Sequence, residues 1–124
     1  MTTALYCVLA AGLMPFIWTG VAKATGPRYN NWNVRLWQSK LEGAAQRAHA
    51  THLNSFEAFP LFAVAVIVAQ MNGADQARVD LLALSFIGLR VLYGILYLAN
   101  QATFRSLSWL AAMVCVVMIF VAGP

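Results

Sequence analysis

Four long apolar stretches follow one another along the chain, separated by short polar segments. A helix that crosses a bilayer needs about 20 consecutive, mostly apolar residues, so each stretch is long enough to cross once. We therefore expect an all-α membrane protein in which residues 1–124 form one bundle of four transmembrane helices. The predicted helices cover residues 3–22, 33–71, 75–100 and 104–122.

Residues that favour turns mark the boundaries of these helices. Residues 23–33 hold a glycine, a proline and three asparagines without an apolar period, which is typical of a loop. From Asn33, an expected N-cap, apolar residues recur at helical spacing, so we predict one long helix to Met71 whose first turns lie outside the membrane. Asp75 is the expected cap of the third helix, and Pro15 predicts a kink in the first.

The composition also indicates a membrane protein. Of the 124 residues, 61% are hydrophobic and 10% are charged, whereas an ordinary soluble domain carries about 25% charged residues. The first apolar stretch has no basic residue before it, because the first is Lys23, so we interpret it as a retained helix and not as a signal peptide. Cys7 and Cys115 lie in apolar stretches without metal-ligand spacing, which predicts packing residues and no metal site.

The basic residues are concentrated in one part of the predicted topology. The second connection carries Arg78 between two acidic residues, Asp75 and Asp80, whereas the first connection and the start of the second helix hold only one acidic residue, Glu42. The positive-inside tendency therefore places the first and third connections in the cytoplasm and both termini on the other side. This distribution explains the net charge of +4 by topology, without nucleic-acid binding. The basic residues of the first group are Lys23, Arg28, Arg35, Lys40 and Arg47.

Polar residues inside the second span predict a cleft. An ionisable side chain at the centre of a bilayer costs about 2.5–3.5 kcal/mol and is kept only where something compensates. Arg47, Asn54 and Glu57 fall at positions i, i+7 and i+10, which is one face of a helix. Glu57 and Arg90, on the third helix, have similar depths at about 1.5 Å of rise per residue, so we expect them to face each other.

The third span carries a matching polar face. Arg90, Tyr93, Tyr97 and Gln101 lie at i, i+3, i+7 and i+11. The alternative interpretation is a buried ion pair that fixes the register of the helices, with tyrosines at the membrane interface. The two histidines flank the polar face and are interpreted as interfacial polar residues, and the four tryptophans as membrane anchors or core. They are His49, His52, Trp18, Trp32, Trp37 and Trp109.

Three short motifs carry a resemblance to a known family. The second helix has Arg47, then Asn-x-x-Glu seven residues on, then Pro60; the third has Arg90-x-x-Tyr93-x-x-x-Tyr97; and the fourth begins with Arg105-Ser106. This combination resembles the membrane-associated proteins in eicosanoid and glutathione metabolism, the MAPEG family, which includes leukotriene C4 synthase and the microsomal glutathione transferases. The resemblance extends over nearly the whole chain.

The resemblance implies a homotrimer that holds glutathione, as co-substrate, between neighbouring subunits near the cytoplasmic face. It implies that Arg105 is catalytic and stabilises the thiolate, because an adjacent guanidinium lowers the pKa of a thiol. Where leukotriene C4 synthase has an arginine and a tyrosine, this chain has Ala50 and Ala58. The expected glutathione-binding residues are Arg47, Asn54, Glu57, Arg90, Tyr93 and Tyr97.

Two function classes follow from these expectations. The first is a membrane glutathione transferase or glutathione-dependent peroxidase that acts on a hydrophobic electrophile from the lipid. The second is a non-catalytic lipid-binding or scaffold protein of the same family. A small transporter fits less well, because the sequence has no inverted repeat or paired broken helices. We expect a multi-pass protein of a bacterial inner membrane, surrounded by lipid, with its site toward the cytoplasm.

Overall fold

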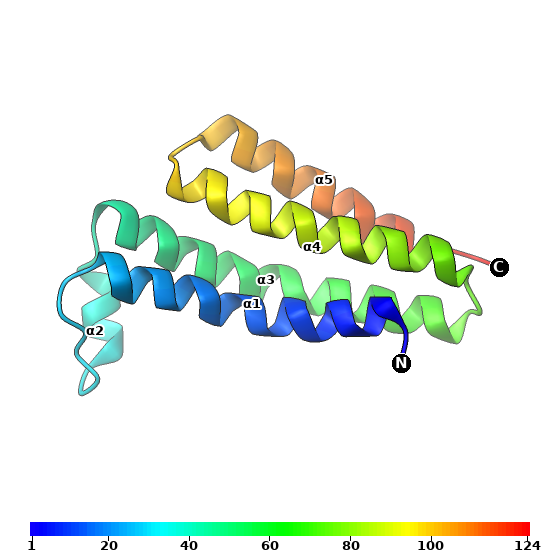
Figure 1. The fold of residues 1–124 in the computed structure, drawn as a ribbon, viewed down its shortest axis with the longest axis horizontal. Helices are drawn as coiled ribbons and strands as arrows, with labels where there is room; N and C mark the ends of the chain where they lie inside the picture. The colour runs from blue at the N-terminus through cyan, green and yellow to red at the C-terminus, as the bar shows by residue number, and fades with distance from the viewer.

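The chain folds into a bundle of four long antiparallel helices with one short helix at one end (Figure 1). The computed structural model describes residues 1–124. Both termini and the connection between α3 and α4 lie at one end of the bundle, and α2 lies at the opposite end. The helices are α1 (Thr3–Thr25), α2 (Val34–Ser39), α3 (Gly43–Met71), α4 (Gln76–Leu98) and α5 (Ala102–Phe120).

The distribution of apolar side chains agrees with a membrane location. All four long helices are long and apolar enough to cross a membrane. Small residues dominate the core between them, as at Ala65 and Ala83, which are fully buried; small side chains let helices approach closely where lipid supplies no hydrophobic driving force. Large apolar side chains such as Leu84 and Val117 face outward. The predicted all-α bundle of four membrane-spanning helices is confirmed.

The predicted helix over residues 33–71 is wrong in one respect, because the chain breaks into α2 and α3. Asn33 caps α2 as predicted, since its side chain accepts from the Leu36 amide at 3.2 Å. The helix then ends, and Gly43 takes a φ of +60°, a left-handed conformation that glycine tolerates. This break turns α2 so that Trp37 and Leu41 are buried against the end of α1. The apolar spacing therefore reflects packing of two helices, not one continuous helix.

The connection between α4 and α5 contains a left-handed residue. α4 ends at Leu98, and Asn100 has a φ of 58°. The amide of Gln101 then donates to the Leu96 carbonyl at 2.9 Å, which satisfies one of the free carbonyls at the end of the helix. Asp75 occupies the N-cap position of α4, as predicted, but its side chain makes no capping hydrogen bond.

A histidine and a proline join α1 to α3. Pro15 lies inside α1, and the Nδ1 atom of His52 lies 2.8 Å from the Pro15 carbonyl oxygen and 2.7 Å from Thr19 Oγ1. Because a carbonyl only accepts hydrogen bonds, Nδ1 carries the proton. His52 is buried, so it is a packing contact between two helices and not the interfacial polar residue that we expected.

Candidate functional site

Polar side chains gather between α3, α4 and α5 near the α2 end of the bundle. Two adjoining cavities, of about 210 Å³ and about 280 Å³, open on this face. Because one is lined by Tyr93 and the other by Tyr97, and these rings lie 5.7 Å apart, we treat the two cavities as one polar cleft. Its lining residues are Gln46, Arg47, Ala50, Asn54, Tyr93, Tyr97, Arg105, Ser106 and Trp109.

Arg105 lines the polar cleft on the side of α5. It lies in the first turn of α5, where the short connection from α4 brings it back over the end of α4. Its guanidinium carbon is 4.1 Å from the centre of the Tyr97 ring, a cation–π contact. Tyr93 is buried, 6% exposed, and meets Tyr97 edge to face. Tyr97 thus holds a partly exposed arginine at the wall of the cleft, and Tyr93 packs against Tyr97.

Arg47 fixes the opposite side of the polar cleft. Its Nε atom donates to the backbone carbonyl of Leu98 at 3.3 Å. Leu98 is the last residue of α4, and a cation at a helix C-terminus is favoured by the helix dipole and by the free carbonyls there. This contact ties the first turns of α3 to the end of α4. It leaves the terminal nitrogens of the Arg47 guanidinium available to a ligand.

The expected pairing of Glu57 with Arg90 is not the contact that the structure contains. Arg90 is buried, 2% exposed, and its Nη2 atom donates to Asn54 Oδ1 at 2.7 Å. Its guanidinium also lies 4.3 Å from the centre of the Tyr93 ring. Glu57 is exposed on α3. The depth argument places the two charges at a similar level in the bundle, but it does not give their direction around the helix axis. Glu57 lies three residues after Asn54, so its side chain points about 60° away from that of Asn54, which contacts Arg90.

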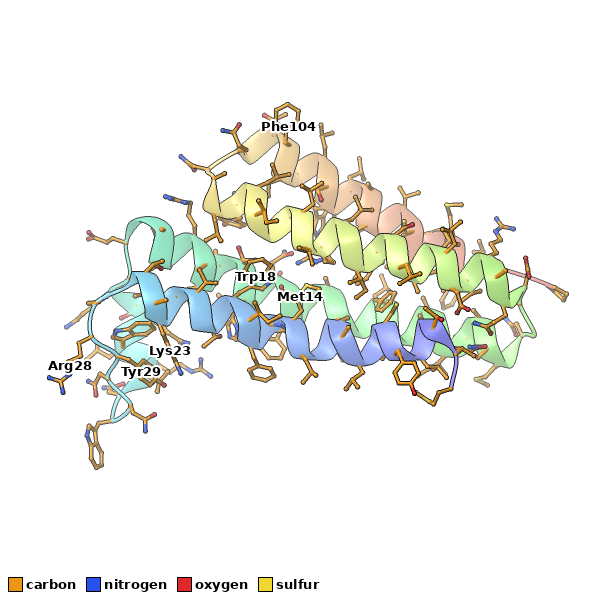
Figure 2. The ribbon with its side chains drawn as sticks, in the orientation of Figure 1. Met14, Trp18, Lys23, Arg28, Tyr29 and Phe104 are labelled. Carbon is orange, nitrogen blue, oxygen red and sulfur yellow. The ribbon has the colours of Figure 1, made fainter.

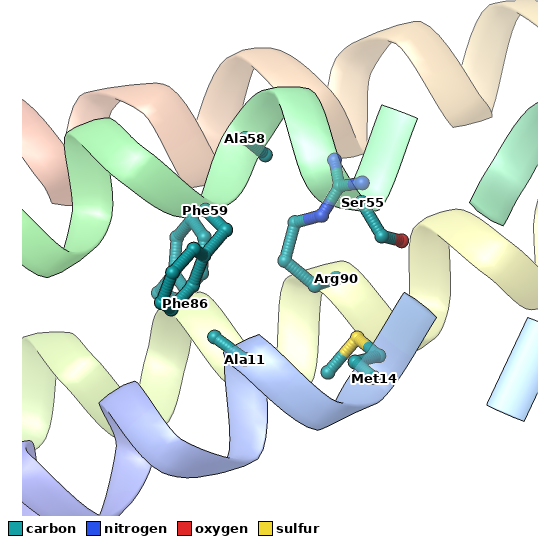
Figure 3. A pocket seen from close by; sticks show the side chains of 7 residues that line it. All are labelled: Ala11, Met14, Ser55, Ala58, Phe59, Phe86 and Arg90. Carbon is teal, nitrogen blue, oxygen red and sulfur yellow. The ribbon is translucent and has the colours of Figure 1, made fainter. Parts of the chain in front are cut away.

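Arg90 consequently lies beneath the polar cleft and not in its wall. It borders a small internal cavity of about 10 Å³ between α1, α3 and α4 (Figure 3). Phe59 and Phe86 line the side of this cavity away from Ser55 in the figure, and Ser55 and the Arg90 guanidinium line the other side. Its lining residues are Ala11, Met14, Ser55, Ala58, Phe59, Phe86 and Arg90.

The two alanines that depart from the family pattern, Ala50 and Ala58, line different cavities. Ala50 lines the polar cleft beside Arg47. Ala58 is buried, 7% exposed, and borders the internal cavity instead. Only the Ala50 position therefore changes the wall of the cleft within one chain. His49 stacks on His52 at 5.8 Å, outside the residues that line the cleft.

Three cleft residues did not emerge as site residues from the sequence. Trp109 was interpreted as an anchor or core residue, yet it lies one turn after Arg105 and lines the same cavity. Ser106 and Gln46 line the cleft as well. The spacing of Arg105 and Trp109, i and i+4, was the available signal, because such residues share a helix face. No group of histidine, cysteine and acidic residues suited to a metal ion is present.

The fold and the site define an integral, multi-pass membrane protein with an arginine- and tyrosine-lined cleft at one end of its bundle. The chain belongs to the MAPEG family, because the model of that family matches residues 3–123. Members of this family include glutathione transferases and peroxidases. No curated protein and no solved structure was found to match the chain.

Proposed function

We propose that this protein is a membrane glutathione transferase or glutathione-dependent peroxidase that acts on hydrophobic electrophiles. Glutathione would lie in the polar cleft as co-substrate, and the electrophile would reach it from the lipid. The support comes from family membership and from the groups that the cleft offers to an anionic peptide.

One observation carries this proposal: the arginines at the polar cleft contact neutral groups and not carboxylates. Arg47 donates to the backbone carbonyl of Leu98, and Arg105 lies over the Tyr97 ring. A positive charge in a membrane span is costly unless a partner compensates it. An anionic ligand would supply that partner, and the planar fork of arginine suits the two carboxylates of glutathione.

The same arrangement suits thiol chemistry. The thiolate is the reactive form, and a free thiol has a pKa near 8.5. The Arg105 guanidinium, held over Tyr97 at 4.1 Å, would lower the pKa of a thiol placed beside it and raise the fraction of thiolate. Asn54, Glu57 and Tyr93 would then orient the peptide, so that the reaction gains from proximity.

The proposal includes the assembly and the location of the protein. Glutathione would lie between neighbouring subunits of a homotrimer, on the cytoplasmic side of a bacterial inner membrane. The basic residues of the α2 end support this orientation through the positive-inside tendency. Lipid would surround the outward-facing apolar side chains and deliver the electrophile.

A thiolate titration tests the proposed function. Purified protein in detergent is titrated with glutathione while the ultraviolet absorbance of the thiolate is followed, and S-methylglutathione serves as the ligand that keeps every charge but has no thiol. We expect an absorbance rise with glutathione alone and conjugation of a generic electrophile. Absence of both results would overturn the proposal that the protein is an enzyme. It would favour the non-catalytic binding protein, in which the cleft holds a lipid or a partner helix.

A further inference from the structure

The two terminal nitrogens of Arg90 have different surroundings. Nη2 donates to Asn54 Oδ1 at 2.7 Å. Nη1 is buried and has no hydrogen-bond partner among the protein atoms. The internal cavity that Arg90 borders, about 10 Å³, has the size of a single water site and includes the Ser55 side chain (Figure 3). Arg90 is thus fixed in the core by the one protein hydrogen bond that it makes, the bond to Asn54.

The chemistry of this bond determines how the Asn54 amide is oriented. A guanidinium has five N–H donors and no acceptor, so the group that it meets on Asn54 must be the oxygen. The amide nitrogen of Asn54, with its two donors, is then directed away from Arg90. Asn54 is also part of the polar cleft, in the same cavity as Tyr93 and Arg105.

We propose that Arg90 is a positioning residue that holds the Asn54 amide with its NH₂ group toward the polar cleft. Arg90 itself does not touch the ligand. An asparagine without such a partner can present either its oxygen or its nitrogen, and an oxygen facing a carboxylate is repulsive. The buried guanidinium removes that alternative, so the cleft is organised for an anion before the ligand arrives.

This inference rests on the proposed function, and Asn54→Asp tests it. Aspartate has nearly the same shape, keeps the oxygen that Arg90 binds and gains an ion pair with it, so the fold is retained. It loses the two amide donors and adds a negative charge to the cleft. We expect the Kd for glutathione to rise at least about tenfold, because a hydrogen bond to a charged group is among the stronger ones. Thermal stability should be unchanged or higher.

The matched control is Asn72→Asp, which makes the same chemical change at an exposed residue in the connection between α3 and α4. This control should leave the Kd for glutathione unchanged. An equal Kd in Asn54→Asp and the unaltered protein would overturn the positioning role. If the unaltered protein does not bind glutathione, the proposed function fails, but the contact between Arg90 and Asn54 can still be tested without ligand. Asn54→Asp should then raise the melting temperature more in the protein that keeps Arg90 than in the protein that carries Arg90→Gln.

Two substitutions of Arg90 test whether the effect passes through Asn54. The side-chain oxygen of glutamine can accept from the Asn54 NH₂ group, so Arg90→Gln allows the inverted amide and should raise the Kd for glutathione several-fold. Lysine, like arginine, only donates, so Arg90→Lys should restore most of that affinity. Equal affinities in the two variants would contradict the inference. If Arg90→Gln does not fold, Arg90→Lys is compared with the unaltered protein, and a loss of glutathione affinity as large as that in Asn54→Asp would contradict the inference.

Discussion

Polar side chains at the two ends of the bundle have different kinds of partners. At the end that holds both termini, Asp80 accepts hydrogen bonds from the Ala4 amide at 2.9 Å and from Gln76 Nε2 at 2.6 Å. Thr2 Oγ1 accepts from the Leu5 amide and from Gln70 Nε2. At the α2 end, the polar residues line open cavities, and the arginines rest on tyrosine rings and backbone carbonyls.

This difference separates two roles of polar side chains in the same fold: a structural role, in which they bond to one another, and a functional role, in which they line a cleft for a ligand. At the terminal end, polar groups complete one another and cap the start of α1, which would otherwise leave free amides. At the α2 end, Arg47 contacts a backbone carbonyl and Arg105 a tyrosine ring, so neither charge is paired with a carboxylate of the chain. Figure 2 shows Lys23 and Arg28 beside Tyr29 at that end, where Lys23 lies 4.1 Å from the centre of the Tyr29 ring. Substitutions at the two ends should therefore affect different properties.

The largest effect is expected for Arg105→Ala. Loss of the guanidinium removes the proposed stabilisation of the thiolate, and removal of one such electrostatic group typically costs about 10²–10³ in kcat. Glutathione binding should be largely kept, because Arg47 and Asn54 remain in the cleft. Steady-state conjugation kinetics measure kcat, and calorimetry measures the Kd.

Arg28→Ala is the control for this substitution. Arg28 is an exposed arginine of the same end and does not line the polar cleft. It should leave kcat unchanged. A kcat for Arg105→Ala within a few-fold of the unaltered enzyme would instead favour a non-catalytic cleft.

A smaller effect is expected for Gly94→Ala, which disturbs the packing behind the polar cleft. A Cβ atom at Gly94 would overlap the Trp18 indole, so the ring must move. Trp18 is buried, 6% exposed, and overpacking of this kind costs about 1–3 kcal/mol. Thermal unfolding should show a lower melting temperature. Because Tyr93 adjoins Gly94 in α4, the Kd for glutathione should rise as well.

Gly88→Ala provides the matched comparison on the same helix. A Cβ atom there has nothing within 4 Å, and alanine is the better helix former by about 1 kcal/mol. This variant should be as stable as the parent or slightly more stable. Equal melting temperatures for the two alanine variants would show that Trp18 does not depend on the space at Gly94.

The sequence predicted the positions of the helices along the chain better than the direction in which each side chain points around its helix axis. Spans of about 20 apolar residues are required by the bilayer itself, so the four crossings could be placed from composition and length. The break at Gly43 was missed, because Trp37 and Leu41 continue a helical spacing while packing against a different helix. A φ of +60° at Gly43 is a property of that packing, and the spacing of apolar residues does not encode it.

The site was predicted in part for the same reason. Arg47, Asn54, Tyr93, Tyr97 and Arg105 come together in the polar cleft, since helical spacing places residues on a common face. Depth along a helix did not determine which way Glu57 and Arg90 point: Arg90 is buried beneath the cleft and Glu57 is exposed. Such rotations depend on how neighbouring helices pack, which a single sequence does not state.

The smallest effect is expected at the terminal end, for Asp80→Ala. This change leaves the Ala4 amide without its acceptor, and loss of a comparable cap typically costs about 1 kcal/mol. Asp75→Ala is its control, because the Asp75 side chain makes no capping hydrogen bond and should be nearly neutral. Thermal unfolding should separate the two variants, while both keep the glutathione Kd and kcat of the parent. A loss of glutathione affinity in Asp80→Ala would mean that the two ends are coupled through the bundle, and the division between structural and functional polarity would fail.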